Sequence, residues 1–443
     1  MRKRRQDRGI RADQAAAADP RSYGRGAAVL SVGIGITGLV TFGYFSLASH
    51  SLPEAEYGHI TLLWSAVFIT VSVLYRPVEQ LLSRTIADRD ARGITGSEHL
   101  RVAATIQLAL GLLFAVVALV LRGPIEDGLF GGSGTLYAIL IATVLAYAAS
   151  YFARGFLAGH HRFGLYGGLV LMEASSRCLF ALAVAVGIAE GQDAVALGMA
   201  AAPIVSLAVV PWALGRRLRR APTAAAAEPT EAAEPQFTLA HGTGFAVAVL
   251  LIMLGEQTFL NAGPLLVEAS EGAQGAALAG FTFNVLLIAR APLQLFQAVQ
   301  TSILPHLTRL RAAGESDPFR RSVNLTLVAI AGFAACVALV MLAVGPFVMD
   351  LLFGEEHDYE RGGLVLVSIG MGLYLSAATL NQALLARGRA GQAAGVWALC
   401  AAGFALFLLL ADFEDRVLQV EIAFVCGAAS LSLLLGLLYR RGA

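Results

Sequence analysis

Hydrophobic residues fall into long, nearly uninterrupted runs along the 443-residue chain, and short polar segments separate these runs. A helix that crosses a bilayer needs about 20 predominantly apolar residues. Runs of this length predict an all-α polytopic membrane protein with about 12 transmembrane helices. The expected helices lie near residues 27–48, 58–77, 101–121, 136–157, 165–187, 194–214, 243–267, 276–300, 322–345, 362–385, 392–411 and 418–439.

The connection at residues 215–240 is rich in Ala, Pro, Glu and Thr, a composition that is typical of a flexible linker. It divides the expected helices into two sets of six. We therefore expect a cytoplasmic basic tail at 1–25, an N-terminal six-helix bundle at 26–214, the linker, and a C-terminal six-helix bundle at 241–443.

The two halves share a weak repeat at the end of their second helices. The first half has R-P-V-E-Q-L-L-S-R from Arg76, and the second has R-A-P-L-Q-L-F-Q from Arg290. With six helices in each half, the repeats must be parallel and related by a pseudo-two-fold axis along the membrane normal, as in alternating-access transporters. We expect residues 78–100 and 301–320 to lie along the cytoplasmic interface as amphipathic helices.

Composition supports a membrane protein. Hydrophobic residues make up 57% of the chain and charged residues 14%, with a mean hydropathy of +0.68. This balance excludes a disordered chain and a disulfide-rich secreted module. The formal net charge of +1 gives no reason to expect a nucleic-acid partner, and the four cysteines all lie inside apolar runs, so no metal or cofactor is expected.

Basic residues indicate the orientation of the chain. Most of the 32 Lys and Arg residues lie in the two termini and in the loops on the same side as the termini. The loops of the other side hold only Arg122, Arg361 and Arg416. Because cytoplasmic loops carry an excess of positive charge, we expect a bacterial plasma-membrane protein with both termini in the cytoplasm.

Motifs for catalysis are absent from the sequence. Residues 33–38 fit G-x-G-x-x-G, but they lie inside an apolar run rather than between a strand and a helix. Small residues that allow two membrane helices to approach closely explain the motif better than a nucleotide site. We find no constellation of acid, base or nucleophile, and we do not expect an enzyme.

Ionisable residues inside the expected helices are the main functional candidates, because a charge at the centre of a membrane helix needs a partner or a wet cavity. Glu173 and Arg177 lie four residues apart on one helix, either as a structural ion pair or as cavity-lining groups. Glu256 stands beside Gln257 and five residues before Asn261, as either a buried neutral acid or a proton or sodium site.

Three arginines add positive charge to the expected interior. Arg290 is too deep to extend its side chain easily to either surface, whereas Arg76 and Arg154 lie nearer the cytoplasmic end. Arg76, Arg177 and Arg290 together outweigh Glu173 and Glu256. The sign of this balance favours an anionic substrate such as a phosphate-bearing lipid head group, since arginine binds phosphate bidentately.

Several short stretches resemble bacterial polysaccharide flippases. The segment L-P-E-A-E-Y-G-H-I-T-L-L-W resembles the "L-G-x-x-x-Y-G" turn between the first two helices of that family. Further resembling stretches include A-R-G-F-L-A-G-H-H-R-F, A-R-A-P-L-Q-L-F-Q-A-V-Q, L-L-F-G-E-E and L-N-Q-A-L-L-A-R-G-R. In chain order, the five stretches occupy residues 52–64, 153–163, 289–300, 351–356 and 380–389.

The family is the polysaccharide-transporter branch (Wzx-type O-antigen flippases) of the multidrug/oligosaccharidyl-lipid/polysaccharide (MOP) superfamily. The resemblance implies a V-shaped transporter that exports undecaprenyl-pyrophosphate-linked oligosaccharides across the plasma membrane. Its expected partners are this substrate, the surrounding membrane lipids and other polysaccharide-assembly proteins. By position, the resemblance implies that Arg76, Arg177 and Arg290 meet the pyrophosphate. Asn261 is a further candidate for binding the substrate.

One departure from the family leaves the coupling ion open. Where an Asp is expected near the middle of the seventh helix, this chain has Gly255-Glu256-Gln257 and then Asn261. Glu256 and Glu173 are the candidate coupling residues. Two other functions stay open: a cation-coupled multidrug antiporter of the same superfamily that uses Glu256, and a non-transporting scaffold for envelope assembly that recruits partners through its tails.

Overall fold

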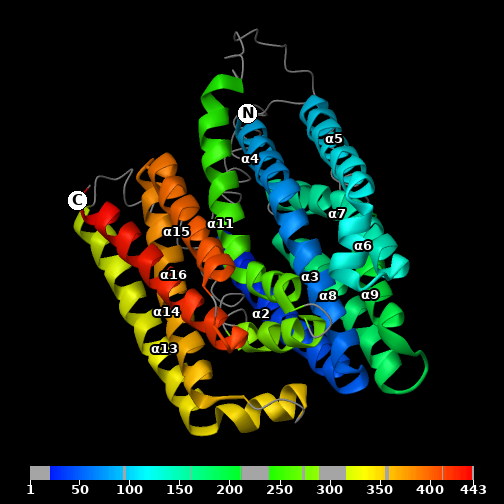
Figure 1. Ribbon diagram of the computed structural model, residues 1–443. Helices are drawn as coiled ribbons and strands as arrows, with labels where there is room; N and C mark the ends of the chain where they lie inside the picture. Colours follow the sequence, from blue (N-terminus) through cyan, green and yellow to red (C-terminus); the bar gives the residue numbers. More distant parts are fainter. Residues whose placement is uncertain are drawn as a thin grey trace, which may run out of the picture.

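A computed structural model describes residues 20–92, 96–160, 162–209, 211, 239–271, 275–288, 316–354, 359–411 and 413–441. Within these ranges the regular structure is helical and there is no strand, so the all-α class is confirmed (Figure 1). The helices of the first half are α2 (Pro20–Ser51), α3 (Glu54–Leu74), α4 (Arg76–Arg92), α5 (Glu98–Val120), α6 (Arg122–Phe130), α7 (Gly134–Gly159), α8 (Phe163–Ala185) and α9 (Gly191–Ser206). Those of the second half are α11 (Leu239–Glu271), Gly275–Ile288, α13 (Ser316–Phe353), α14 (Arg361–Ala386), α15 (Ala390–Leu410) and α16 (Arg416–Arg440).

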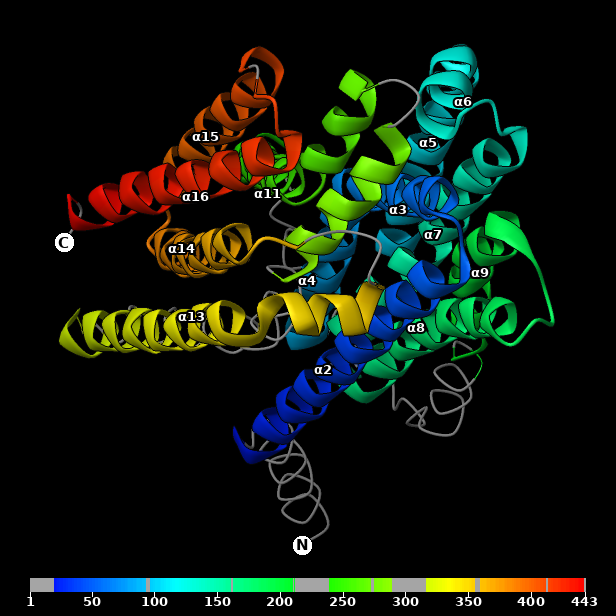
Figure 2. The same ribbon diagram turned by 60° about the horizontal axis from the view of Figure 1, so that its bottom comes forward.

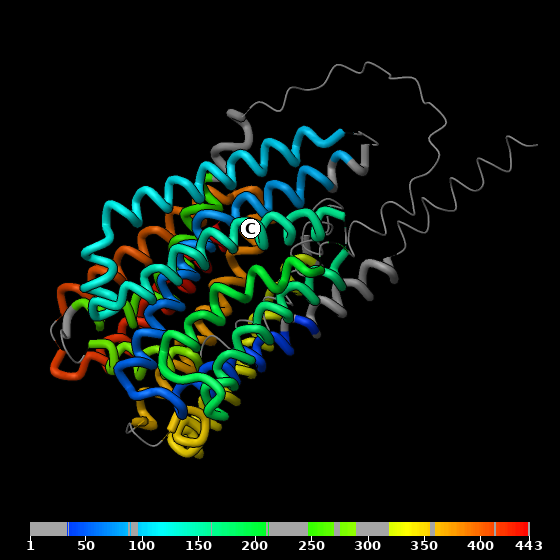
Figure 3. Tube along the Cα trace, turned by 90° about the vertical axis from the view of Figure 1, so that its right-hand side faces the viewer, coloured from blue at the N-terminus to red at the C-terminus, as the bar shows by residue number. Residues whose placement is uncertain are grey.

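Ten helices in the described part of the chain are long and apolar enough to cross a membrane. Two further expected spans coincide with α2 and with the short apolar helix Gly275–Ile288, whose continuation lies outside the described residues. In the perpendicular view the described helices run broadly along one common direction, as the spans of a bilayer do (Figure 3). A total of twelve spans stays a prediction.

Each half is held together mainly by its own helices. In the first half α2 packs along α8, and α7 packs against α4 and α9; in the second half α14 lies between α13 and α16, and α11 packs on α15 (Figures 1 and 2). A Cβ built on Gly33 would stand 3.5 Å from the Cα of Gly167, so α2 and α8 are in close contact at this point. This contact at Gly33 agrees with a packing role for the glycine motif at 33–38.

The expected interfacial helix after residue 78 is wrong. Helix α4 continues α3 after a turn at Tyr75 and packs inside the bundle against α7. Val78, Leu82 and Ile86 of α4 are buried. They are four positions apart and so lie on one face of the helix. The basic residues of α4 made it resemble a surface helix, but its apolar face meets another helix instead of lipid head groups. The matching prediction for residues 301–320 falls largely outside the described residues.

The two halves meet at the end of the molecule where α2 turns into α3. The rings of Phe45 and Phe283 are 4.7 Å apart between centroids. Closer to the end, the Tyr57 hydroxyl donates to the side-chain oxygen of Asn284, and the Asn284 amide donates to the Tyr359 hydroxyl over 3.4 Å. These hydrogen bonds join Tyr57 of the first half to Asn284 and Tyr359 of the second half. Burial raises the pKa of Tyr359 to about 12, so its hydroxyl stays protonated.

A charged cavity between the two halves

A cavity of about 250 Å³ lies behind this contact, and its walls come from both halves. Most of its lining belongs to α2, α3, α4, α7 and α8 of the first half, with a smaller share from α11 and Gly275–Ile288. The lining residues are Thr37, Thr41, Phe45, Trp64, Phe68, Ser72, Arg76, Glu79, Tyr151, Arg154, Tyr166, Val170, Glu173, Arg177, Gln257, Leu260, Asn261 and Leu287.

The lining residues recur about one turn apart on each helix, which explains how the sequence places them together. Residues three or four positions apart share one face of a helix. One such stripe runs from α3 into α4 and another runs along α8. The two stripes are Trp64, Phe68, Ser72, Arg76, Glu79 and Tyr166, Val170, Glu173, Arg177.

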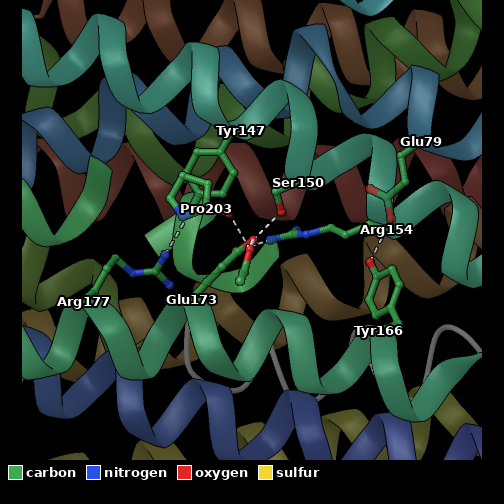
Figure 4. Close-up of polar contacts among 9 residues, drawn as sticks. Glu79, Tyr147, Ser150, Arg154, Tyr166, Glu173, Arg177 and Pro203 are labelled. Atoms are coloured by element: carbon green, nitrogen blue, oxygen red, sulfur yellow. Dashed lines mark hydrogen bonds and ion pairs between the residues drawn. The ribbon is translucent and has the colours of Figure 1, made fainter. Parts of the chain in front are cut away.

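Glu173 is paired with Arg154 of α7 and not with Arg177. Of the two alternatives for Glu173 and Arg177, the ion pair within α8 is therefore wrong, and both residues line the cavity. The Arg154 guanidinium donates to one carboxylate oxygen of Glu173, and the hydroxyls of Ser150 and Ser206 donate to the other (Figure 4). Glu173 is only 1% exposed. A helical spacing of four residues permits an ion pair, but here α7 presents a guanidinium from the opposite side and α8 directs Arg177 elsewhere.

Arg177 lies in an aromatic environment. Its guanidinium donates to the Tyr147 hydroxyl over 2.8 Å and lies 5.1 Å from the ring centroid of Trp64 and 5.8 Å from that of Phe68 (Figure 4). The residue is 4% exposed, and its Nε–H has no hydrogen-bond partner. It forms no ion pair with any described carboxylate. Aromatic faces stabilise the cation but leave its Nε–H donor unused.

The end of the cavity near α4 has a more balanced set of charges. The Tyr166 hydroxyl donates to Glu79 over 2.9 Å, and the Glu79 carboxylate interacts electrostatically with Arg154 and Arg76. Glu256 of α11 is close enough to Arg76 to interact with it electrostatically. Arg76 therefore has two carboxylates nearby, whereas Arg177 forms no ion pair among the described residues.

The wall from the second half is neutral among the described residues. It consists of two carboxamides, Gln257 and Asn261, and two leucines, Leu260 and Leu287. The Asn261 amide donates to the Gln257 side-chain oxygen over 3.0 Å and to its backbone carbonyl over 3.3 Å. These bonds hold the two amides in line along one face of α11.

Four of the residues expected at the site line this cavity, namely Arg76, Glu173, Arg177 and Asn261. Glu256 lies beside it on α11 rather than among its lining residues. Arg290 lies outside the described residues, so its place stays a prediction.

The cavity lining also includes Glu79, Tyr151 and Tyr166, which we did not expect at the site from the sequence. Arg154 lines it too, although we expected its side chain to reach the surface. A detectable signal existed on α7: Tyr147, Ser150, Tyr151 and Arg154 fall at the spacing of one helix face within an otherwise apolar run.

Comparisons with known proteins agree with this architecture. No protein-family model matches the chain. Two curated relatives from Mycobacterium tuberculosis, the uncharacterized proteins MT1558/MT1560 (strain CDC 1551 / Oshkosh) and Rv1510 (strain ATCC 25618 / H37Rv), are each 26% identical over 350 residues, covering 76% of this chain and 72% of theirs.

Among solved structures, the eukaryotic MATE transporter AtDTX14 matches with a TM-score of 0.67 at 15% identity, over 94% of this chain and 95% of that one. A mutant of the Vibrio cholerae MATE transporter VcmN gives 0.61 at 19% identity, over 95% and 98%. A MOP superfamily transporter from Pyrococcus furiosus, described as having a binding pocket of reverse polarity that suggests a different function, gives 0.63 at 14% identity, over 94% and 95%. The chain is therefore a multi-pass membrane protein with the fold of MATE-type transporters of the MOP superfamily.

Proposed function

We propose that this protein is a flippase that moves an undecaprenyl-(pyro)phosphate-linked oligosaccharide across a bacterial plasma membrane by alternating access, for surface polysaccharide synthesis. The observation that carries the proposal is Arg177, a buried cation in the cavity wall with an unused Nε–H donor and no described carboxylate partner. A buried cation without a counter-ion is costly, so the site favours an anionic ligand that supplies one.

A phosphate group is the anion that suits this site best. Guanidinium groups bind phosphate oxygens through two parallel hydrogen bonds, and such charge-assisted bonds are roughly twice as strong as neutral ones. Arg154 lines the same cavity, and its Nε–H also lacks a hydrogen-bond partner. Two guanidinium groups with unused donors would bind a pyrophosphate better than a single phosphate.

The size of the cavity supports a mechanism in which the protein opens and closes. Sites for small ligands typically measure about 300–1,000 Å³, whereas this cavity measures about 250 Å³. The phosphate end of the carrier fits this volume better than a complete oligosaccharide does. The halves would separate further to admit the sugars, while the polyprenyl tail stays in the lipid around the helices.

Deletion of the gene in its native host tests the proposal, with mass spectrometry of lipid-linked sugars from protoplasts and intact cells. We expect a complete repeat unit on a polyprenyl carrier to accumulate in the cytoplasmic leaflet. Wild-type protein and Arg122→Ala should restore export, because Arg122 is an exposed residue paired with Glu126 at 2.7 Å. Arg177→Ala at equal protein level should not. Unchanged lipid-linked sugars after deletion would contradict the proposal.

The second candidate function is a cation-coupled multidrug antiporter. Two observations favour it: the MATE transporters among the structural neighbours and the carboxylates of Glu79, Glu173 and Glu256 at or beside the cavity. In that case Glu256→Gln would abolish drug resistance and leave surface glycans intact. The scaffold alternative predicts that Arg177→Ala and Glu256→Gln both leave function intact, whereas removal of residues 1–25 abolishes it.

A further inference from the structure

The two walls of the cavity differ in chemistry. Among the described lining residues, every charged one belongs to the first half, and those of the second half are two carboxamides and two leucines. A carboxamide offers a donor and an acceptor but carries no charge. It cannot neutralise a phosphate, whereas it can pair with a hydroxyl or an acetamido group of a sugar.

The carboxamides of the second half are held ready for a ligand. The Gln257 side-chain oxygen accepts from the Asn261 amide, which fixes the side-chain direction of Gln257. The Gln257 side chain is 6% exposed and lines the cavity. Within the described part of the chain its Nε2 group donates to no other residue. A nearly buried amide donor at the cavity wall lacks an acceptor that a ligand could supply.

We infer that Gln257, positioned by Asn261, is a specificity-determining residue that recognises the first sugar of the carrier-linked glycan, while the arginines of the opposite wall bind the phosphate. This inference rests on the proposed function and extends it. In a lipid-linked oligosaccharide the first sugar is attached directly to the phosphate. A phosphate held at Arg177 and Arg154 therefore brings that sugar within the same cavity, whose remaining polar groups include this amide pair.

The division of the site has a consequence for selectivity. A site that hydrogen-bonds a substrate hydroxyl or amide discriminates against analogues that lack it, because its own buried groups are then left unpaired. Loss of Gln257 should therefore weaken the preference for a glycan-bearing carrier and leave affinity for the bare carrier nearly unchanged. Loss of Arg177 should weaken binding of both.

The test measures binding to purified full-length protein by native mass spectrometry with two probes: undecaprenyl pyrophosphate, and the same carrier bearing one N-acetylglucosamine. We expect Gln257→Met, which keeps side-chain length but removes the amide, to lower affinity for the sugar-bearing probe about 10-fold, the effect of one or two lost hydrogen bonds. Affinity for the bare carrier should change less than about twofold. Thr258→Val is the matched control, since Thr258 is adjacent on α11, does not line the cavity, and bonds to Leu254 of its own helix.

Each outcome decides between the two claims. Equal losses for both probes in Gln257→Met, or an unchanged preference for the sugar-bearing probe, would overturn the role of Gln257 and leave the flippase proposal standing. Failure of the wild-type protein to bind either probe would overturn the flippase proposal and this inference together. Asn261→Leu is a second test variant, because it removes the hydrogen bond that positions the Gln257 side chain. It should also lower affinity for the sugar-bearing probe and leave affinity for the bare carrier nearly unchanged.

Discussion

Substitution of Gly58 by Ala should open the end of the molecule where the two halves meet. Gly58 lies on α3 directly against the helix Gly275–Ile288. A Cβ at this position would stand 1.8 Å from the carbonyl oxygen of Ala276 and 2.3 Å from its carbonyl carbon. These are backbone atoms, so no side-chain rotation can relieve the clash.

The size of the effect follows from the cost of overpacking. An extra carbon in a well-packed interface typically costs about 1–3 kcal/mol. Because the clash exists only while the halves are in contact at this end, the cost falls on the closed state alone. A difference of this size shifts a two-state equilibrium about 5–150-fold towards the state that is open at this end.

Cysteine labelling measures this shift. We would replace the four native cysteines and introduce Thr41→Cys, which lines the cavity and is buried. With both termini in the cytoplasm, as the distribution of basic residues predicts, a membrane-impermeant maleimide added to intact cells should label this cysteine faster in Gly58→Ala. Gly362→Ala is the matched control, because a Cβ there has nothing within 4 Å. Equal labelling rates in Gly58→Ala and Gly362→Ala would refute the reasoning.

Three further predictions concern stability. Glu173→Gln removes the ion-pair partner of Arg154 and should lower the free energy of unfolding by about 3 kcal/mol. This is the lower end of the range for a broken buried pair, because Glu79 also interacts electrostatically with Arg154. An unchanged Tm in detergent would contradict this prediction. Gly159→Ala should cost about 1–3 kcal/mol, since its Cβ would stand 2.7 Å from the Cβ of Ile86, whereas Gly168→Ala, with nothing within 4 Å, should not. The pKa of Tyr359 is raised from 10.0 to about 12. The buried, protonated hydroxyl therefore makes its full contribution to the free energy of unfolding below pH 10, and this contribution declines as the pH rises towards 12. A loss of stability near pH 8 in the wild type that Tyr359→Phe removes would exclude this assignment.

The membrane helices could be predicted closely because hydropathy is a local property of the chain. The expected boundaries at 136–157 and 165–187, for example, correspond to α7 and α8 within a few residues. The path of α4 could not be predicted in the same way. Whether Val78, Leu82 and Ile86 face lipid or protein depends on Gly155 and Gly159 of α7, which make room for α4 and lie more than 60 residues away in the chain.

The candidate site shows the same limit. Charges inside apolar runs identified Arg76, Glu173 and Arg177 as interior groups, because burial of a charge is costly wherever the helix lies. The pairing of Glu173 depends on how α7 and α8 are rotated about their axes, and spacing within one helix contains no information on this rotation. The same holds for the aromatic surroundings of Arg177, which come from α3 and α7.

The charge of the transported molecule is the central claim, and a transport assay in proteoliposomes tests it most directly. Purified protein would be reconstituted with a fluorescent undecaprenyl-pyrophosphate-linked sugar, and its movement between leaflets followed by an impermeant quencher, in parallel with uptake of a fluorescent organic cation. We predict that the wild type moves the lipid-linked sugar, that Arg177→Gln does not, and that neither moves the cation. Transport of the cation by the wild type, with no movement of the lipid-linked sugar, would contradict the account.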